Sequence, residues 1–390
     1  MMFSSRLGWD SRPNRLAAAL QARRRAGRAI LDLTESNPTR AGFAYPGAEV
    51  LAALSDPRSL RYDPAPAGSI EAREAVAAYY AGRGQAVEPE RILLTASTSE
   101  AYAYLFKVLA DPGDQVLVPR PSYPLFDFLA ALESVKLIPY PLVYDGRWSL
   151  DLEALARAST DRSRAVILVN PNNPTGSFLK KRELEGLVAF CRERSLAIIS
   201  DEVFSDYAFG PDAERVTTLA GVEGVLAFCL SGLSKIAGLP QMKLGWIVTA
   251  GPAAARAQAM ERLELVADTY LSVGTPVQCA LPRLLAAGAA VRDQIARRVR
   301  ENLDALRRAL TSAPACQLLE PEGGWYAILR VPRTRSEEEW CLELVEHEDV
   351  LVQPGYFYDF ESEAYLVASL LTARAAFDEG VRRLVSRAKL

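Results

Sequence analysis

Short apolar runs alternate with helix-like segments between residues 92 and 249 of the chain. The runs are rich in Val, Ile and Leu and show little alternation with polar residues, which is typical of strands buried on both faces. Amphipathic segments such as KKRELEGLVAFCRERS separate several of them. This alternation predicts a mostly parallel sheet covered by helices. The seven runs expected to be strands are RILLTAS, QVLVPRP, VKLIPYP, AVILVNP, LAIISDE, VLAFCLS and LGWIVTA.

The pattern changes after about residue 252. A long helical region that includes VRDQIARRVRENLDALRRALTS is followed by four shorter strand-like runs, CQLLEPE, GWYAILRVP, VLVQPG and AYLVASL. A chain of 390 residues also exceeds the usual size of a single core. The expected fold class is therefore α/β, with a large domain built on a mostly parallel seven-stranded sheet between helices and a smaller α+β domain at the C-terminus.

Composition narrows the classes of function. A net charge of −3 argues against a nucleic-acid partner, and no apolar run is long enough to predict a membrane span. The N-terminal MMFSSRLGWDSRPNRL has no apolar segment typical of secretion signals, and the five cysteines are scattered, so a cytoplasmic protein with reduced thiols is expected. With His347 as the single histidine, a histidine-based metal site or catalytic triad is not expected.

Chemically capable side chains follow the predicted strands, and in open α/β sheets ligands bind beyond the carboxyl ends of the strands. Taken singly, each has an ordinary explanation: the serines can cap a helix, and a lysine is usually a surface residue. Together they offer an anion pocket at a helix N-terminus, an aromatic ring, a rigid asparagine turn, a carboxylate and an amine. The residues in question are Ser97, Thr98, Ser99, Tyr123, Asn173, Asp201 and Lys235.

This set matches the needs of one cofactor. A lysine amine forms a Schiff base with an aldehyde, a carboxylate keeps a pyridine nitrogen protonated, an aromatic side chain stacks on the ring, and an anion pocket takes a phosphate. These are the groups that bind pyridoxal 5'-phosphate.

The chain also resembles the class I/II aminotransferases of the aspartate aminotransferase superfamily, the fold-type-I pyridoxal-phosphate enzymes, from about residue 31 to the C-terminus. The resemblance implies an N-terminal arm at residues 1–40 that belongs to the small domain, a large cofactor-binding domain at 41–270 and a small domain at 271–390. Its landmarks stand in the family's order: LDLTESNPT, RYDPAPAG, TASTSEA, DPGDQVLVPRPSYP, VNPNNPTG, SDEVFSDY, LSKIAGLPQMKLGW, EGGWYAILRVP and VLVQPG.

The resemblance implies a role for each matching residue. Lys235 becomes the Schiff-base lysine and the general base, Asp201 the partner of the pyridine nitrogen, and Tyr123 the residue that stacks on the ring. Asn173 matches the residue that hydrogen-bonds the phenolic oxygen. The phosphate contacts implied within the chain are Thr98, Ser99, Ser234 and Lys243. Tyr62 matches a tyrosine that the family sends across a homodimer interface to the partner's phosphate site.

Several positions depart from the family pattern. Lys243 stands where the family usually has arginine, so the phosphate would lose a bidentate contact. Phe204 replaces a tyrosine that contacts the phenolic oxygen, and the pKa of the Schiff base is expected to rise in consequence. Gly232 replaces a serine. Ser36 occupies the usual glycine position beside the substrate carboxylate.

The departure with the largest consequence concerns substrate binding. Val367 stands where the family has the arginine that clamps the substrate α-carboxylate, and Arg374 lies seven residues on, in a predicted helix. Ordinary α-amino acids are therefore expected to be poor substrates. Either another group such as Arg40 anchors the carboxylate, or the substrate carries its acid group elsewhere or has none.

The resemblance implies an aminotransferase that works by a ping-pong mechanism on an amino donor and a 2-oxo acid. Two alternatives remain: a lyase or decarboxylase with the same cofactor, and a non-catalytic regulatory relative. The sequence does not name the donor or the acceptor.

Overall fold

The computed structural model describes residues 2–9 and 12–389. Its larger sheet has eight strands in the order β2-β9-β8-β7-β6-β3-β4-β5. Strand β9 is antiparallel to both of its neighbours and β5 is antiparallel to β4, whereas the other pairs are parallel. The strands are β2 (Ile92–Thr95), β3 (Gln115–Arg120), β4 (Lys136–Tyr144), β5 (Trp148–Leu150), β6 (Ser163–Val169), β7 (Ala197–Asp201), β8 (Ala227–Gly232) and β9 (Gly245–Ala250). All seven predicted strands are confirmed, and β5 is an additional short one.

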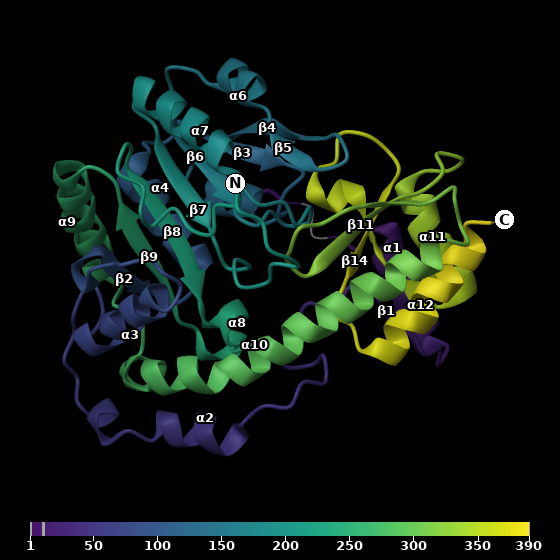
Figure 1. Ribbon diagram of the computed structural model, residues 1–390, viewed down its shortest axis with the longest axis horizontal. Helices are drawn as coiled ribbons and strands as arrows, with labels where there is room; N and C mark the ends of the chain where they lie inside the picture. Colours follow the sequence, from purple (N-terminus) through teal and green to yellow (C-terminus); the bar gives the residue numbers. More distant parts are fainter. Residues whose placement is uncertain (1, 10–11, 390) are drawn as a thin grey trace.

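Helices cover both faces of this sheet (Figure 1). The core on one face includes residues of α3 (Ile70–Ala81), α6 (Leu152–Ala158) and α7 (Lys181–Glu193). The core on the other face includes residues of α4 (Thr98–Leu109), α5 (Phe126–Leu132) and α9 (Ala253–Tyr270). Central strands such as β7, β8 and β9 are buried at every position, which explains the unbroken apolar runs in the sequence.

A smaller antiparallel sheet lies in the C-terminal part of the chain, as predicted. Its order is β10-β11-β14-β13, and a separate parallel pair joins β1 to β12. The strands are β1 (Leu31–Asp32), β10 (Gln317–Leu319), β11 (Tyr326–Arg330), β12 (Val350–Leu351), β13 (Gln353–Pro354) and β14 (Tyr365–Ser369). Residues of the helices α1 (Arg15–Arg25), α11 (Glu337–Glu348) and α12 (Arg374–Arg387) contribute to the core of this part.

The 36-residue helix α10 (Thr275–Leu310) joins the two parts of the molecule (Figure 1). Its first half packs into the core of the large sheet through Leu281 and Leu284, and its second half packs into the smaller core through Ile295 and Leu303. Helix α2 (Gly47–Leu54) lies along α10. Because α10 belongs to both cores, the domain boundaries at residues 40/41 and 270/271 stay a prediction.

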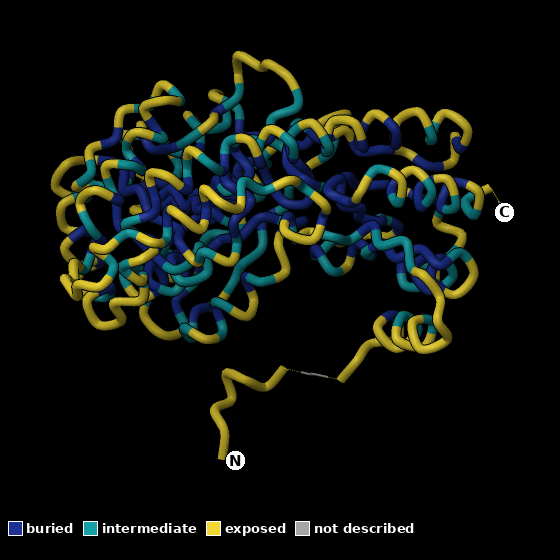
Figure 2. Tube along the Cα trace, turned by 90° about the horizontal axis from the view of Figure 1, so that it is seen from below, coloured by how far each residue is buried: buried dark blue, intermediate teal, exposed yellow. Residues whose placement is uncertain are grey.

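Buried residues form the interior of the molecule, and the exposed residues 2–9 run outside it (Figure 2). The cysteines are free, and all except Cys279 are buried. Within the described ranges, no helix is long and apolar enough to cross a membrane. Short 3₁₀ helices occupy Ser5–Leu7, Pro57–Leu60, Pro89–Arg91, Pro240–Met242 and Gly355–Tyr358.

Candidate active site

A cavity of about 300 Å³ lies where strands β6, β7 and β8 end. Residues at the ends of these strands, Val169, Asp201 and Gly232, form part of its wall, as expected for a ligand site of an open α/β sheet. The cavity brings together most of the residues singled out from the sequence. These are Ser36, Thr98, Ser99, Tyr123, Asn173, Asp201, Ser234, Lys235 and Lys243.

Two predicted site residues do not line this cavity. The side chain of Arg40 is 77% exposed, and its Nε lies 3.9 Å from a carboxylate oxygen of Glu35. Tyr62 is 77% exposed and lines a separate surface groove. The predicted contact of Tyr62 is with the partner's site, so its role stays a prediction. The structure does not bring Arg40 to the place where a substrate carboxylate was expected.

Lys235 lies on the short helix α8 (Leu233–Ile236), directly after strand β8. Two phenols fix the backbone here: the Tyr207 hydroxyl donates to the Lys235 carbonyl and the Tyr45 hydroxyl donates to the Gly238 carbonyl, each at 2.6 Å. Gly238 has φ +64°, and a Cβ there would lie 2.8 Å from Cγ1 of Val291. The turn after the lysine therefore favours glycine, and the backbone that carries Lys235 is held in place.

Burial lowers the pKa of Lys235, although the nearby Asp201 carboxylate acts in the opposite direction. Aromatic rings flank the amine: Nζ lies 5.2 Å from the ring centroid of Trp325 and 5.8 Å from that of Phe204. A lowered pKa increases the fraction of neutral amine, which is the nucleophilic form. The site therefore favours attack by this lysine on a carbonyl carbon.

Asp201 is the last residue of strand β7, and burial raises the pKa of its carboxyl group to about 6. The Val203 amide donates to one carboxylate oxygen at 3.2 Å, and the Tyr102 hydroxyl donates to the other at 3.3 Å. These hydrogen bonds lower the pKa, but desolvation is the larger effect. A protonated ring nitrogen in the cavity would supply the positive charge that favours the ionised carboxylate.

Helix α4 begins at the cavity. Ser97 caps it, because its hydroxyl accepts a hydrogen bond from the Glu100 amide at 3.2 Å, and the first helical residues, Thr98 and Ser99, line the cavity. The ordinary interpretation of Ser97 is thus confirmed. The free amides of a helix N-terminus, with Lys243 in the same wall, form an arrangement that attracts a phosphate.

Two glycines allow the close approach that shapes this end of the cavity. A Cβ on Gly232 would lie 2.8 Å from the Gly245 Cα. A Cβ on Gly245 would lie 3.0 Å from the Ser231 carbonyl oxygen and 3.3 Å from the Ser97 carbonyl carbon. A serine at position 232, as in the family pattern, would therefore require the ends of strands β8 and β9 to separate.

The described residues fit pyridoxal phosphate. Asn173 Oδ1 is buried in the cavity wall without a hydrogen-bond partner among them, so a polar atom is left for a ligand to satisfy. The same wall holds an amine, a buried acid, an aromatic ring and a helix N-terminus. This donor set suits an aldehyde, a ring nitrogen, a flat ring and a phosphate.

The C-terminal part of the chain contributes one wall residue and one neighbour of the lysine that were not singled out from the sequence. Tyr326 lines the cavity, and burial raises the pKa of its hydroxyl to about 12. A hydrogen bond with Ser36 acts in the opposite direction but has the smaller effect. Trp325 stands beside the lysine amine. The motif EGGWY predicts a flexible turn followed by two aromatic residues. Nothing in the motif indicates that this turn contacts the large sheet.

Val367 occupies apolar surroundings. It is fully buried, lies in register with Ile328 of β11 and Gln353 of β13, and packs with Trp148 and Tyr358. Arg374 begins α12, where it bonds Asp378 and the Glu301 carbonyl. The interpretation that Arg374 points elsewhere is therefore confirmed.

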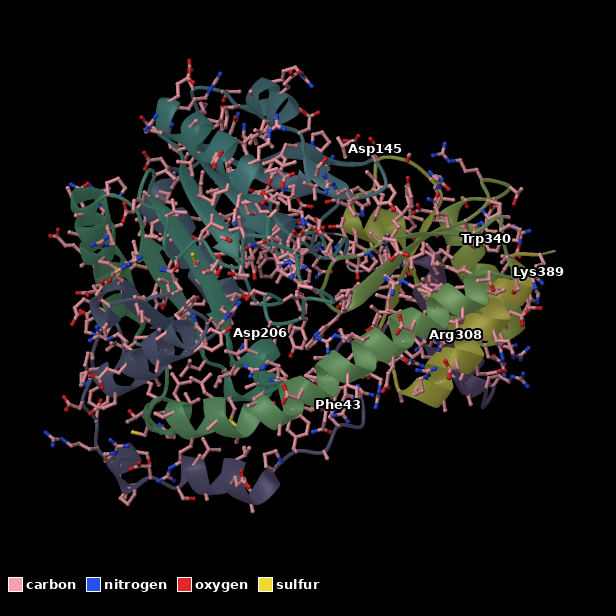
Figure 3. The ribbon with its side chains drawn as sticks, in the orientation of Figure 1. Phe43, Asp145, Asp206, Arg308, Trp340 and Lys389 are labelled. Carbon is pink, nitrogen blue, oxygen red and sulfur yellow. The ribbon has the colours of Figure 1, made fainter. Side chains whose placement is uncertain are left out.

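A charged cluster supports the segment that follows Asp201. Asp206 lies between the large sheet and α10 (Figure 3), 3.1 Å from an Arg83 nitrogen and 3.8 Å from an Arg292 nitrogen of α10. The Tyr79 hydroxyl donates to the same carboxylate at 3.0 Å. This cluster holds the backbone next to Tyr207, which in turn bonds the carbonyl of the lysine.

Comparison with known proteins identifies the class of protein. The profile of the family "Aminotransferase class I and II" matches residues 29–373. A glutamate-pyruvate aminotransferase, AlaA, of Haemophilus influenzae is 25% identical over 366 residues, which cover 92% of this chain and 90% of that protein. An alanine aminotransferase of Mycobacterium bovis is 27% identical over 361 residues, or 90% of this chain and 82% of that protein.

The fold comparison agrees. The crystal structure of an aminotransferase from Escherichia coli superimposes with a TM-score of 0.87 at 23% identity and covers 100% of this chain and 98% of that one. The chain thus belongs to the class I and II aminotransferases.

Proposed function

We propose that this aminotransferase uses pyridoxal 5'-phosphate and works by a ping-pong mechanism, in which a donor leaves its amino group at the site and a 2-oxo acid then collects it. The observation that carries the proposal is a single cavity that holds the Lys235 amine, the buried Asp201 carboxylate and the N-terminus of α4. A lyase or decarboxylase remains the alternative, and a non-catalytic relative is disfavoured because this set of residues is intact.

Each residue has a defined task in this proposal. When bound, the cofactor supplies an electron sink next to the carbon that carries the amino group. Asp201 keeps the ring nitrogen protonated, and Lys235 carries a proton to and from the substrate carbon. Tyr123 stacks on the ring and Asn173 orients it. The phosphate is held by the start of α4 together with Ser234 and Lys243.

The proposal includes a homodimer in the cytoplasm. Tyr62, which the family resemblance assigns to the partner's phosphate site, lines an open surface groove together with Tyr104 and Leu271. An exposed tyrosine beside a surface groove of mixed polarity is a feature of protein interfaces, and it supports contact with a second copy of the chain.

A spectral half-reaction tests the proposed function. The relatives are named for glutamate, pyruvate and alanine, so L-alanine and L-glutamate are the first donors to try. For an aminotransferase, the visible absorbance of the bound cofactor should fall when the donor is added and return when pyruvate is added. A lyase would turn over without any 2-oxo acid, and a binding protein would not turn over at all.

We expect a weak preference for donors that carry an α-carboxylate. L-Alanine and isopropylamine differ only by a carboxylate in place of a methyl group. A charge-assisted bidentate bond to the carboxylate would favour L-alanine by about 1.5–3 kcal/mol, or roughly ten- to a hundredfold in kcat/KM. Since Val367 fills the expected place of the arginine, the measured ratio of kcat/KM for the two donors should be below about tenfold.

Arg40→Ala serves as the companion variant. Because Arg40 does not line the cavity, this change should leave kcat/KM for L-alanine within about twofold. A strong preference of the wild-type protein for L-alanine that disappears in Arg40→Ala would instead identify Arg40 as the carboxylate anchor and contradict the expectation.

We also expect Phe204→Tyr to lower the pKa at which the bound cofactor changes colour. The Phe204 ring lines the cavity near the Lys235 amine, and a hydroxyl there could donate to the phenolic oxygen of the cofactor. A hydrogen bond to a charged oxygen should lower this pKa by about one unit. Spectral titration measures the shift, with Phe126→Tyr, a second phenylalanine in the wall, as the control. An unchanged pKa would mean that the ring of Phe204 does not face that oxygen.

A further inference from the structure

Lys180 immediately precedes helix α7, at the position that usually caps a helix. Ser, Thr, Asp and Asn are preferred there, and a cation is disfavoured by the positive end of the helix dipole. The backbone amide of Lys180 donates to the Glu183 side chain at 2.7 Å, a contact that does not need a lysine side chain at position 180. Formation of the helix therefore does not account for a lysine at this position.

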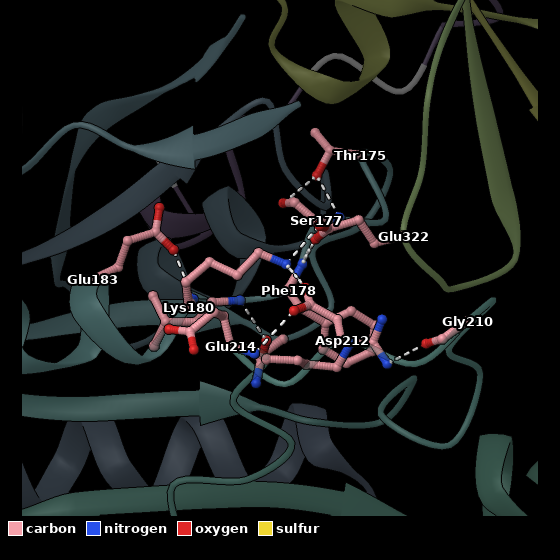
Figure 4. Close-up of polar contacts among 12 residues, drawn as sticks. Thr175, Ser177, Phe178, Lys180, Glu183, Gly210, Asp212, Glu214 and Glu322 are labelled. Carbon is pink, nitrogen blue, oxygen red and sulfur yellow. Dashed lines mark hydrogen bonds and ion pairs between the residues drawn. The ribbon is translucent and has the colours of Figure 1, made fainter. Parts of the chain in front are cut away.

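The Lys180 side chain reaches two carboxylates (Figure 4). Its Nζ lies 2.7 Å from Asp212 Oδ2 and 2.5 Å from Glu322 Oε1. The lysine side chain is only 13% exposed, and those of Asp212 and Glu322 are 30% and 23% exposed. The Lys180 ammonium and the Glu322 carboxylate are largely shielded from water and Asp212 is the more exposed partner, so the pair with Glu322 is stronger than a typical surface pair.

Glu322 connects three backbone segments. Its second carboxylate oxygen accepts from the Phe178 amide at 2.9 Å. Its own amide donates to the Gly176 carbonyl at 3.1 Å, and its carbonyl accepts from the Phe209 amide at 2.9 Å. Lys180 thus holds a residue whose side chain and backbone both bridge the joint between the C-terminal part and the large sheet.

Each connected segment carries a wall residue of the cavity. Asn173 lies in the segment that includes Gly176, Phe204 in the one that includes Phe209, and Tyr326 four residues after Glu322. The packing is tight: a Cβ on Gly176 would lie 2.4 Å from the Gly323 carbonyl oxygen. A shift of residues 320–324 would therefore be transmitted to Trp325 and Tyr326.

Removal of the Lys180 ammonium group would leave the Asp212 and Glu322 carboxylates without the cation that they share. The hydrogen bond from Lys180 is the main reason that the pKa of Asp212 lies below its ordinary value. Without the lysine, Asp212 and Glu322 would repel each other, and the turn at residues 320–324 would keep its backbone hydrogen bonds but lose the ion pair that helps to hold it.

We propose that Lys180 is a positioning residue: with Glu322 and Asp212 it holds the turn at residues 320–324 against the Asn173 turn, and so fixes Tyr326 in the cavity wall where the donor binds. The inference rests on the aminotransferase activity of the site. The Gly238 turn after the lysine is held by Tyr45 and the Asp201 carboxylate by Tyr102, and both contacts lie outside these segments, so the main effect should fall on donor binding rather than on chemistry.

Lys180→Met in the holoenzyme tests the proposal, with Lys181→Met as the matched control, because Lys181 is the next residue and its side chain is exposed. With L-alanine as donor and 2-oxoglutarate as acceptor, Lys180→Met should raise KM for L-alanine about tenfold while kcat changes less than about threefold. Lys180→Arg should restore most of the loss, and Lys181→Met should behave as wild type.

Glu322→Gln is the second variant, since it keeps an acceptor for the Phe178 amide and removes only the charge. The double variant with Lys180→Met should be no worse than Lys180→Met alone, because both changes break one interaction. Amide hydrogen exchange over residues 174–180 and 320–326 should speed up in Lys180→Met and not in Lys181→Met. This readout needs no substrate, so it tests the proposal even where the proposed function fails.

Additive losses in the double variant would overturn the proposal. So would a lowered melting temperature with unchanged KM and unchanged local exchange, because Lys180 would then act on overall stability alone.

Discussion

Replacing Lys235 with alanine is expected to abolish the visible absorbance of the bound cofactor and to lower kcat by at least about a thousandfold. The amine would be lost both as the group that attaches to the cofactor aldehyde and as the base that moves the substrate proton. Absorbance spectra and steady-state kinetics of the purified variant measure the two effects.

Lys243→Ala is the matched control, since this second lysine lines the same cavity. It should keep the absorbance band and bind the cofactor more weakly, because only a phosphate contact is lost. A band that persists in Lys235→Ala, or one that disappears only in Lys243→Ala, would contradict the assignment of Lys235.

The second large effect is expected for Asp201→Asn. The variant keeps the shape of the side chain but cannot offer a full negative charge to the ring nitrogen, so kcat should fall by at least about a hundredfold and the cofactor should dissociate more readily. Kinetics and equilibrium dialysis with pyridoxal phosphate measure these losses. Unchanged activity would mean that another group holds the ring nitrogen.

The same change should stabilise the cofactor-free protein at neutral pH. Folding raises the pKa of Asp201 to about 6, so the folded state binds more protons than the unfolded state between about pH 4 and 6. Stability is therefore lost as pH rises through this window, by about 3 kcal/mol when the carboxylate is fully ionised. Denaturant unfolding measures the effect: the free energy of unfolding of Asp201→Asn should exceed that of wild type by an amount that grows from pH 4 to pH 7. A constant difference would refute the raised pKa.

The large sheet could be predicted because its strands are buried on both faces and stand out as continuous apolar runs. Strand β5 was missed because a three-residue strand at the sheet edge gives no such pattern. The location of the site followed from the rule that the carboxyl ends of parallel strands share one edge. Asp201 and Lys235 could therefore be placed close together from their positions alone.

Contacts between distant segments could not be predicted. Lys180 and Glu322 lie 142 residues apart, and neither stands in a pattern that indicates the other. Trp325 and Tyr326 were visible as aromatics after a glycine pair, but their approach to Lys235 depends on how the smaller sheet docks. Interactions of this kind arise from tertiary packing, for which one sequence carries no periodic signal.

The pairing of β1 with β12 has a consequence for how the chain is made. Leu31 pairs with Val350, so after β1 is synthesised about 319 further residues (350 − 31) must follow before its partner exists. Local segments of the large sheet can fold meanwhile, whereas the N-terminal strand stays unpaired and open to other strand edges. Contacts of such sequence separation slow folding. The pairing of β1 with β12 should therefore be a late step of folding.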